Sequence, residues 1–120
     1  MVGKITPNYI EVRQGDSFTI LLQFKDEKIG FIDISGSLLK MFVKNKADNK
    51  IVLIKQGVID DGINGKAHIS IIPEDTVKLN IEDDFITDIQ ITFANGETHT
   101  IYPQLISQVA SFIVTQQVTE

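Results

Sequence analysis

Apolar and polar residues alternate along most of the chain, so every second side chain falls on the same side of an extended backbone. No long segment keeps the spacing of an amphipathic helix. Gly, Asn, Asp and Pro interrupt the alternation at short intervals, as turn residues do between strands. The pattern predicts strands over residues 8–13, 17–25, 37–44, 51–55, 66–72 and 110–118, and a β-hairpin within 83–104.

The segment 17–25 shows the clearest alternation and is expected to be a core strand. Its apolar side consists of Phe18, Ile20, Leu22 and Phe24. Two segments are expected to be loops. Residues 25–37 are rich in charges, with a short extended stretch at 31–34, and residues 57–65 contain three glycines.

The hairpin is expected to turn at Asn95-Gly96, because Asn-Gly between two alternating runs favours a two-residue turn with positive φ. A two-residue turn also fixes the register. The expected pairs are Ala94 with Glu97, Phe93 with Thr98, Ile91 with Thr100, and Ile89 with Tyr102. This register buries Ile91 and Phe93 and leaves His99 exposed.

One short helical turn is expected near residues 73–79. Proline is tolerated at the first helical position, and Glu74 and Asp75 suit the N-terminal end of the helix dipole. About seven to eight short strands with one helical turn are typical of an antiparallel immunoglobulin-like β-sandwich. A chain of 120 residues can bury such a core without metal or disulfide. We expect a single domain over residues 1–120, with residues 1–7 as a flexible N-terminal arm.

The composition disfavours several functional classes. The chain has no cysteine, which removes disulfides, thiolate metal ligands and cysteine nucleophiles. Its net charge is −5 and Arg13 is its only arginine, so nucleic acids and anionic membranes are unfavourable partners. The N-terminus lacks the apolar core of a signal peptide, and no apolar run is long enough to cross a bilayer. We expect a soluble protein made in the cytoplasm.

The residues that could carry chemistry have ordinary structural explanations. His68 and His99 are the only histidines, each falls on the polar side of its strand, and no G-x-S-x-G motif accompanies them. The acidic residues at 60–61 resemble half of a calcium loop, but the closing glutamate is missing and an Asx-rich turn is favoured. The acidic run 82–84 favours a solvated loop over a cation site. We expect no catalytic residue, no cofactor, no metal site and no enzyme activity.

Two apolar features suggest protein contacts. Leu38 and Phe42 share a strand side with Lys40 and Lys44, where the alternative to an interface is a loop that covers them. The connection 104–112 is unusually apolar. The last strand, with the preceding connection 104–109, is the favoured interface, because an unpaired strand edge offers backbone hydrogen bonds to a partner. The candidate interface residues are Leu38, Phe42, Leu105, Ile106, Val109 and Phe112. The lysines between residues 40 and 55 are read as a solvated face, with an acidic partner as the alternative.

Five stretches then occur in an order that resembles a known family. They are QGDSFTILLQFKD (14–26), FIDISGSLLKMFVK (31–44), GKAHISIIPEDTVKL (65–79), DDFITDIQITFANGETHTIY (83–102) and ASFIVTQQVT (110–119). This order is similar to the small immunoglobulin-like proteins of bacteriophage tails and baseplates, including the N-terminal domain of baseplate upper proteins. The resemblance covers about residues 10–119.

The resemblance implies a non-enzymatic virion structural or adaptor protein of the tail, baseplate or neck. It would be made in the host bacterial cytoplasm and held in the virion by contacts with other virion proteins, as a homo-oligomer or ring. Residues 103–108 depart from the family pattern, being longer and more apolar than its glycine-containing turn. The chain also ends at Glu120, where longer relatives continue, so attachment to fibres is not expected. The alternative is a carbohydrate-binding or adhesin-type sandwich, for which Tyr9 and Tyr102 provide few aromatic platforms.

Overall fold

The computed structural model describes residues 4–26, 28–103 and 109–115. These residues form twelve strands and one short helix. The strands are β1 (Lys4–Ile5), β2 (Tyr9–Arg13), β3 (Phe18–Gln23), β4 (Lys25–Asp26), β5 (Gly30–Phe31), β6 (Leu38–Asn45), β7 (Ile51–Gln56), β8 (Val58–Asp61), β9 (Lys66–Ile71), β10 (Phe85–Thr92), β11 (Thr98–Tyr102) and β12 (Ala110–Thr115). The helix α1 (Pro73–Val77) follows β9, as the acidic turn after Pro73 predicted.

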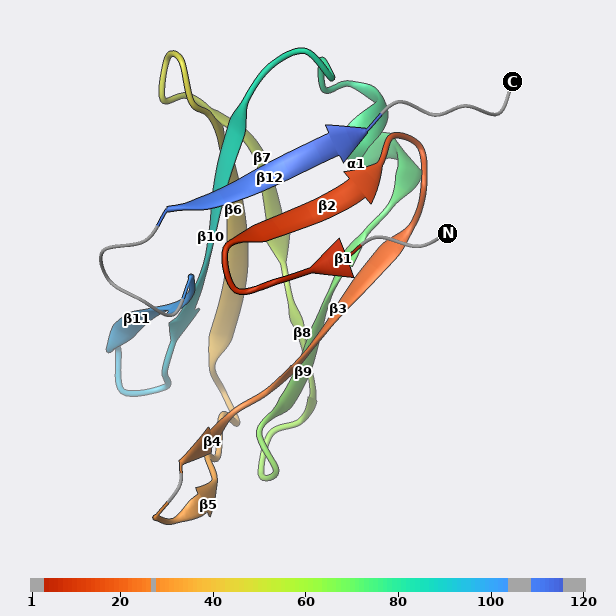
Figure 1. The fold of residues 1–120 in the computed structure, drawn as a ribbon. Helices are drawn as coiled ribbons and strands as arrows, with labels where there is room; N and C mark the ends of the chain where they lie inside the picture. Colours follow the sequence, from red (N-terminus) through yellow and green to blue (C-terminus); the bar gives the residue numbers. More distant parts are fainter. Residues whose placement is uncertain (1–3, 27, 104–108, 116–120) are drawn as a thin grey trace.

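The strands build two main sheets (Figure 1). Sheet A has the order β1-β2-β12-β10-β6-β7, and β11 also pairs with β10. Sheet B has the order β3-β9-β8, and β4 and β5 form a separate small hairpin. β2 pairs with β12 in parallel, and every other pairing among the described strands is antiparallel. The expected all-β, immunoglobulin-like sandwich is confirmed, with more short strands than expected.

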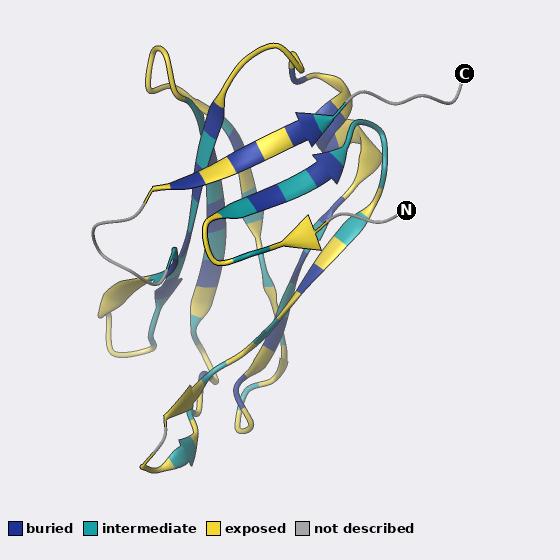
Figure 2. Ribbon diagram, viewed as in Figure 1, coloured by how far each residue is buried: buried dark blue, intermediate teal, exposed yellow. Residues whose placement is uncertain are grey.

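The inward sides of the two sheets form one core. Sheet A contributes alternate residues of β2, β6, β10 and β12, and sheet B contributes Ile20, Ala67, Ile69 and Ile71. On β2 and β12, Figure 2 shows buried residues alternating with more exposed ones. Burial therefore follows the period-two pattern of the sequence.

The β10–β11 hairpin forms, but its loop has three residues instead of two. The Phe93 N–H donates to the Glu97 carbonyl oxygen (2.8 Å), and the Gly96 N–H donates to the Phe93 oxygen (2.9 Å). The loop is therefore residues 94–96. Gly96 has a φ of +95°, as the last residue of a three-residue hairpin loop requires.

The extra loop residue makes the expected register wrong near the turn. Ile91 faces His99 instead of Thr100, and a bulge after Ile89 restores the expected pairing of Ile89 with Tyr102. Ile91 is buried and His99 exposed, as expected. Phe93 is only half-buried, because it lies at the turn, with its ring centroid 5.7 Å from that of His99.

Three loop or terminal segments also differ from expectation. Residues 58–61, expected within a loop, form β8 and pair with β9. The charged segment after Gln23 forms the β4–β5 hairpin, whereas the expected extended stretch 31–34 contributes only Phe31 to a strand. Residues 4–7 of the expected flexible arm form β1 and its turn, held by a 2.8 Å hydrogen bond from the Tyr102 hydroxyl to the Thr6 oxygen. Residues 1–3 lie outside the described residues.

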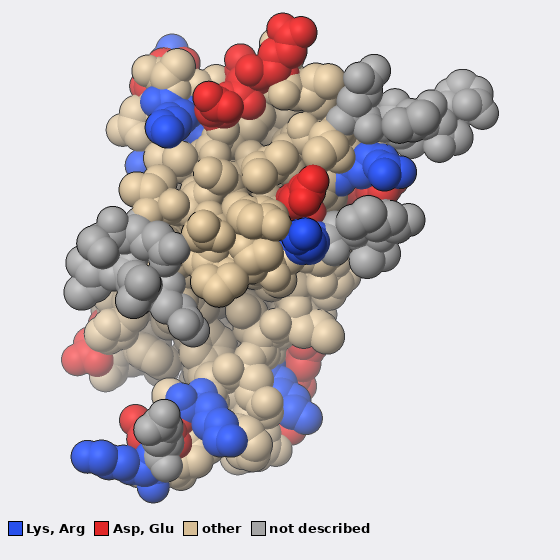
Figure 3. Space-filling view, viewed as in Figure 1, with Lys and Arg blue, Asp and Glu red and all other residues tan. Residues whose placement is uncertain are grey.

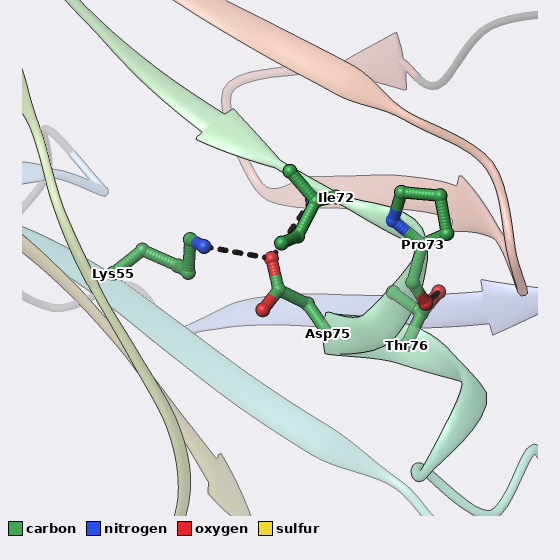
Figure 4. A network of polar contacts seen from close by, with 5 residues as sticks. All are labelled: Lys55, Ile72, Pro73, Asp75 and Thr76. Atoms are coloured by element: carbon green, nitrogen blue, oxygen red, sulfur yellow. Dashed lines mark hydrogen bonds and ion pairs between the residues drawn. The ribbon is translucent and has the colours of Figure 1, made fainter.

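An ion pair joins the β7 edge of sheet A to the helix that follows sheet B (Figure 4). Lys55 Nζ lies 2.9 Å from Asp75 Oδ2, and both side chains are largely buried. The same Asp75 oxygen accepts the Ile72 N–H at 2.8 Å. Asp75 therefore accepts a hydrogen bond from the backbone at the start of α1 and also pairs with the Lys55 ammonium group. A buried charge is tolerated only when it has such partners.

Candidate functional site

The outer side of β6 carries the exposed apolar residues that the sequence singled out. Leu39, Met41 and Val43 are buried in the core. Leu38 and Phe42 therefore point away from it, and Leu38 is 39% exposed while Phe42 is half-buried. Their orientation is as expected, and their role as an interface remains a prediction.

Residues from two neighbouring strands flank Phe42 on this outer side. Ile54 of β7 lies directly opposite Phe42 and is 51% exposed. Asp88 of β10 lies opposite Phe42 on the other flank. These three residues, Ile54, Phe42 and Asp88, form a row across sheet A that we call the Phe42 row. It places two apolar side chains beside one carboxylate on an accessible sheet face.

Asp88 is the electrostatically unusual member of the Phe42 row. Burial raises the pKa of its carboxyl group above the ordinary value, and the nearby Lys44 opposes this shift. Its Oδ1 atom is inaccessible to solvent and has no hydrogen-bond partner among the described residues. An ionised carboxylate with an unsatisfied oxygen is costly, and a cation held beside the carboxyl group from outside would reduce that cost through its charge.

Two lysines complete the outer side of β6. Lys40 and Lys44 directly follow the buried residues Leu39 and Val43, so they lie on the outer side of the strand. Both are partly exposed. Lys40 faces Gln90 and Lys44 faces Ile86 on β10. The Phe42 row is therefore an apolar and acidic centre with one lysine before it and one after it on β6, and protein interfaces commonly combine an apolar centre with a polar rim.

The remaining candidate interface residues have different outcomes. Val109 is 64% exposed, directly before β12. Phe112 is only 2% exposed and packs in the core, so its place among contact residues is wrong. Leu105 and Ile106 lie outside the described residues.

The last strand is also not a free edge, contrary to expectation. β12 lies between β2 and β10, with Val114 opposite Val12 and Phe112 opposite Phe85. β2 pairs in parallel with residues 111–115 of β12, and β10 pairs with residues 110–112 on the other side. The first half of β12 therefore has no free edge for a partner strand.

The histidines take separate positions. His68 Nδ1 lies 2.8 Å from Asp60 Oδ2 on the outer side of sheet B, and both groups are partly exposed. His99 Nε2 lies 3.7 Å from Glu97 Oε1 at the exposed end of the hairpin. A nucleophilic triad would need a hydroxyl within hydrogen-bond reach of one of these rings, and the described residues provide no such hydrogen bond.

The two acidic segments make hydrogen bonds within the fold, and Asp83 Oδ2 accepts one from the Asn45 side-chain amide at 3.3 Å. Asp61 accepts the Asn64 N–H and side-chain amide, and these hydrogen bonds lower the pKa of the Asp61 carboxyl group. Acidic groups gather at the upper end of the view in Figure 3, near the exposed residues 82–84 between α1 and β10.

Across residues 4–26, 28–103 and 109–115, no three His, Asp or Glu side chains are grouped as metal ligands. No helix in that part of the chain is long and apolar enough to cross a membrane.

Comparisons with known proteins show a distant likeness in fold. No protein-family model and no curated protein matches the chain. A solved structure of murine CRIg is similar over 94% of this chain and 96% of that chain, with 11% sequence identity and a TM-score of 0.41. The assignment of the fold therefore rests on the strand order and pairing within this structure.

Proposed function

We propose that this chain is a non-enzymatic structural or adaptor protein of a bacteriophage tail, baseplate or neck, and that it binds a neighbouring virion protein through the outer side of sheet A. The order of its sequence motifs supports the virion assignment. The observation that carries the binding surface is the Phe42 row, where an accessible apolar pair adjoins a carboxylate that lacks a partner among the described residues.

The Phe42 row also indicates the chemistry of the partner surface. Apolar side chains would cover Phe42 and Ile54, and an Arg or Lys side chain would reach Asp88. A cation at that position favours the ionised carboxylate and so lowers the pKa that burial has raised. Because the pair would be largely desolvated, removing either member would leave the other unpaired and weaken binding strongly.

We expect Ile54→Asp and Asp88→Asn each to reduce incorporation of the protein into phage particles. Ile54→Asp places a charge in the apolar part of the interface, and Asp88→Asn removes the charge that attracts the partner's cation. For a residue central to an interface, the loss is about 2 kcal/mol, which is more than tenfold in Kd. The measurement is the amount of the chain in purified particles, alongside the melting temperature of each purified variant.

Ile63→Asp is the matched control, because Ile63 is 71% exposed and lies between β8 and β9, on the other sheet. This variant should enter particles normally. Normal incorporation of both Ile54→Asp and Asp88→Asn, with unchanged melting temperatures, would remove the Phe42 row from the assembly interface.

A further inference from the structure

β3 has one unoccupied edge within the described part of the chain. In sheet B it pairs only with β9, with Leu21 opposite His68. Beyond the end of β3 the Phe24 N–H donates to the Gly65 oxygen at 2.8 Å. Because antiparallel bonding alternates along a strand, the N–H and C=O groups of Leu22, Ile20 and Phe18 also point toward β9. Those of Thr19, Leu21 and Gln23 point to the free edge.

The other strands of the two main sheets that pair on one side only carry features that discourage pairing with a further strand. β11 pairs with β10 through a bulge after Ile89 and is followed directly by Pro103. β1 has two residues. β8 has four residues, a bulge after Ile59 and two aspartates. β7 is paired to β6 through a bulge at Val43/Lys44 and contains Lys55. Short length, bulges and charges are the devices that normally protect strand edges.

β3 has none of these devices. It has six residues, FTILLQ, with no charge, proline or glycine. Leu21, at its middle, is 81% exposed, the highest value among the large apolar residues of the described chain. A regular, uncharged strand with unsatisfied backbone groups is suited to pairing with another strand.

We propose that a second copy of this chain pairs with β3 in an antiparallel arrangement about a two-fold axis at Leu21. In this register Leu21 lies opposite Leu21 of the other copy, and Thr19 lies opposite Gln23 of the other copy. Apolar residues therefore pair with apolar residues, and polar residues with polar residues. No charge lies within β3, so self-pairing brings no like charges together along the strand. The two three-stranded sheets then become one continuous sheet. This surface is separate from the Phe42 row, so neither proposal depends on the other.

Single-cysteine variants test the pairing and its register, because the natural chain contains no cysteine. Residues directly opposite each other in an antiparallel pair lie about 5.5 Å apart at Cα, within the range that a disulfide can span. Under mild oxidation, Leu21→Cys should form a covalent dimer. Thr19→Cys alone should not, whereas Thr19→Cys combined with Gln23→Cys should. Ile63→Cys, at a similarly exposed position, is the control for random collision.

We expect Leu21→Cys to form dimer at least about tenfold faster than Ile63→Cys, because pairing raises the effective concentration of the two thiols. The reduced variants should keep the melting temperature of the natural chain, since Leu21 is outside the core. Equal rates for Leu21→Cys and Ile63→Cys would overturn the proposal. Efficient dimerisation of Thr19→Cys alone would overturn the two-fold register, and capture of a different protein by Leu21→Cys in phage particles would overturn self-pairing.

Discussion

Phe112→Ala is expected to lower the free energy of unfolding by about 3–5 kcal/mol, the range measured when a large buried aromatic is truncated. Phe112 is 2% exposed and is among the largest fully buried side chains of the core. It lies opposite Phe85 of β10 and Ile10 of β2, so the cavity opens where three strands of sheet A meet. Chemical denaturation of the purified variant measures this loss.

Ile113→Ala is the matched control, because Ile113 is the next residue of β12 and points outward. It should cost less than about 1 kcal/mol, as surface substitutions usually do. Similar losses for the two variants would contradict the assignment of the inward side of β12. A small loss for Phe112→Ala would reopen its role as a contact residue.

Gly65→Ala is expected to lower the free energy of unfolding by about 2–5 kcal/mol. Gly65 has a φ of +69°, and a left-handed conformation costs a non-glycine residue about 1–2 kcal/mol. A Cβ atom there would also lie 2.6 Å from the Phe24 oxygen and 2.8 Å from the Ile32 oxygen. Both contacts are with backbone, so relief requires a backbone shift, at a cost of about 1–3 kcal/mol.

Gly96→Ala separates these two contributions. Gly96 has a φ of +95°, and no atom lies within 4 Å of an added Cβ. This variant should therefore show only the conformational cost of about 1–2 kcal/mol. Equal losses at the two glycines, measured by the same denaturation experiment, would show that the chain does not pass as close to Gly65 as the structure has it.

Alternation in the sequence predicts which residues point into the core, because it depends only on the geometry of one strand. Leu39, Met41 and Val43 on β6, and Ala67, Ile69 and Ile71 on β9, follow this alternation and are buried. The hairpin register was wrong near the turn, because Asn-Gly fits a two-residue loop and also the last two positions of a three-residue loop. The sequence does not separate these two loops, and they differ by one residue in register.

Features that depend on which strands are neighbours could not be predicted. The alternation of 17–25 is compatible with a central strand or an edge strand, and only the order of sheet B identifies β3 as an edge. The last strand was predicted to have a free edge because nothing in its own sequence indicates the parallel pairing with β2, which is distant along the chain. The sequence alone identifies Leu38 and Phe42 as apolar residues on the side of the strand that carries lysines. Ile54 and Asp88 are placed beside Phe42 by pairing between strands, which the sequence does not predict.

Cross-linking of intact phage particles with an amine-reactive reagent, followed by mass spectrometry, tests the proposed virion role most directly. Lys40 and Lys44 flank Phe42, so a bound partner would lie within reach of both amines. We predict that the chain is present in the particles and that these two lysines link to another virion protein. Lys50, in the turn between β6 and β7, provides the comparison within the same chain. Absence of the chain from purified particles, or links from Lys50 with none from Lys40 or Lys44, would contradict the account.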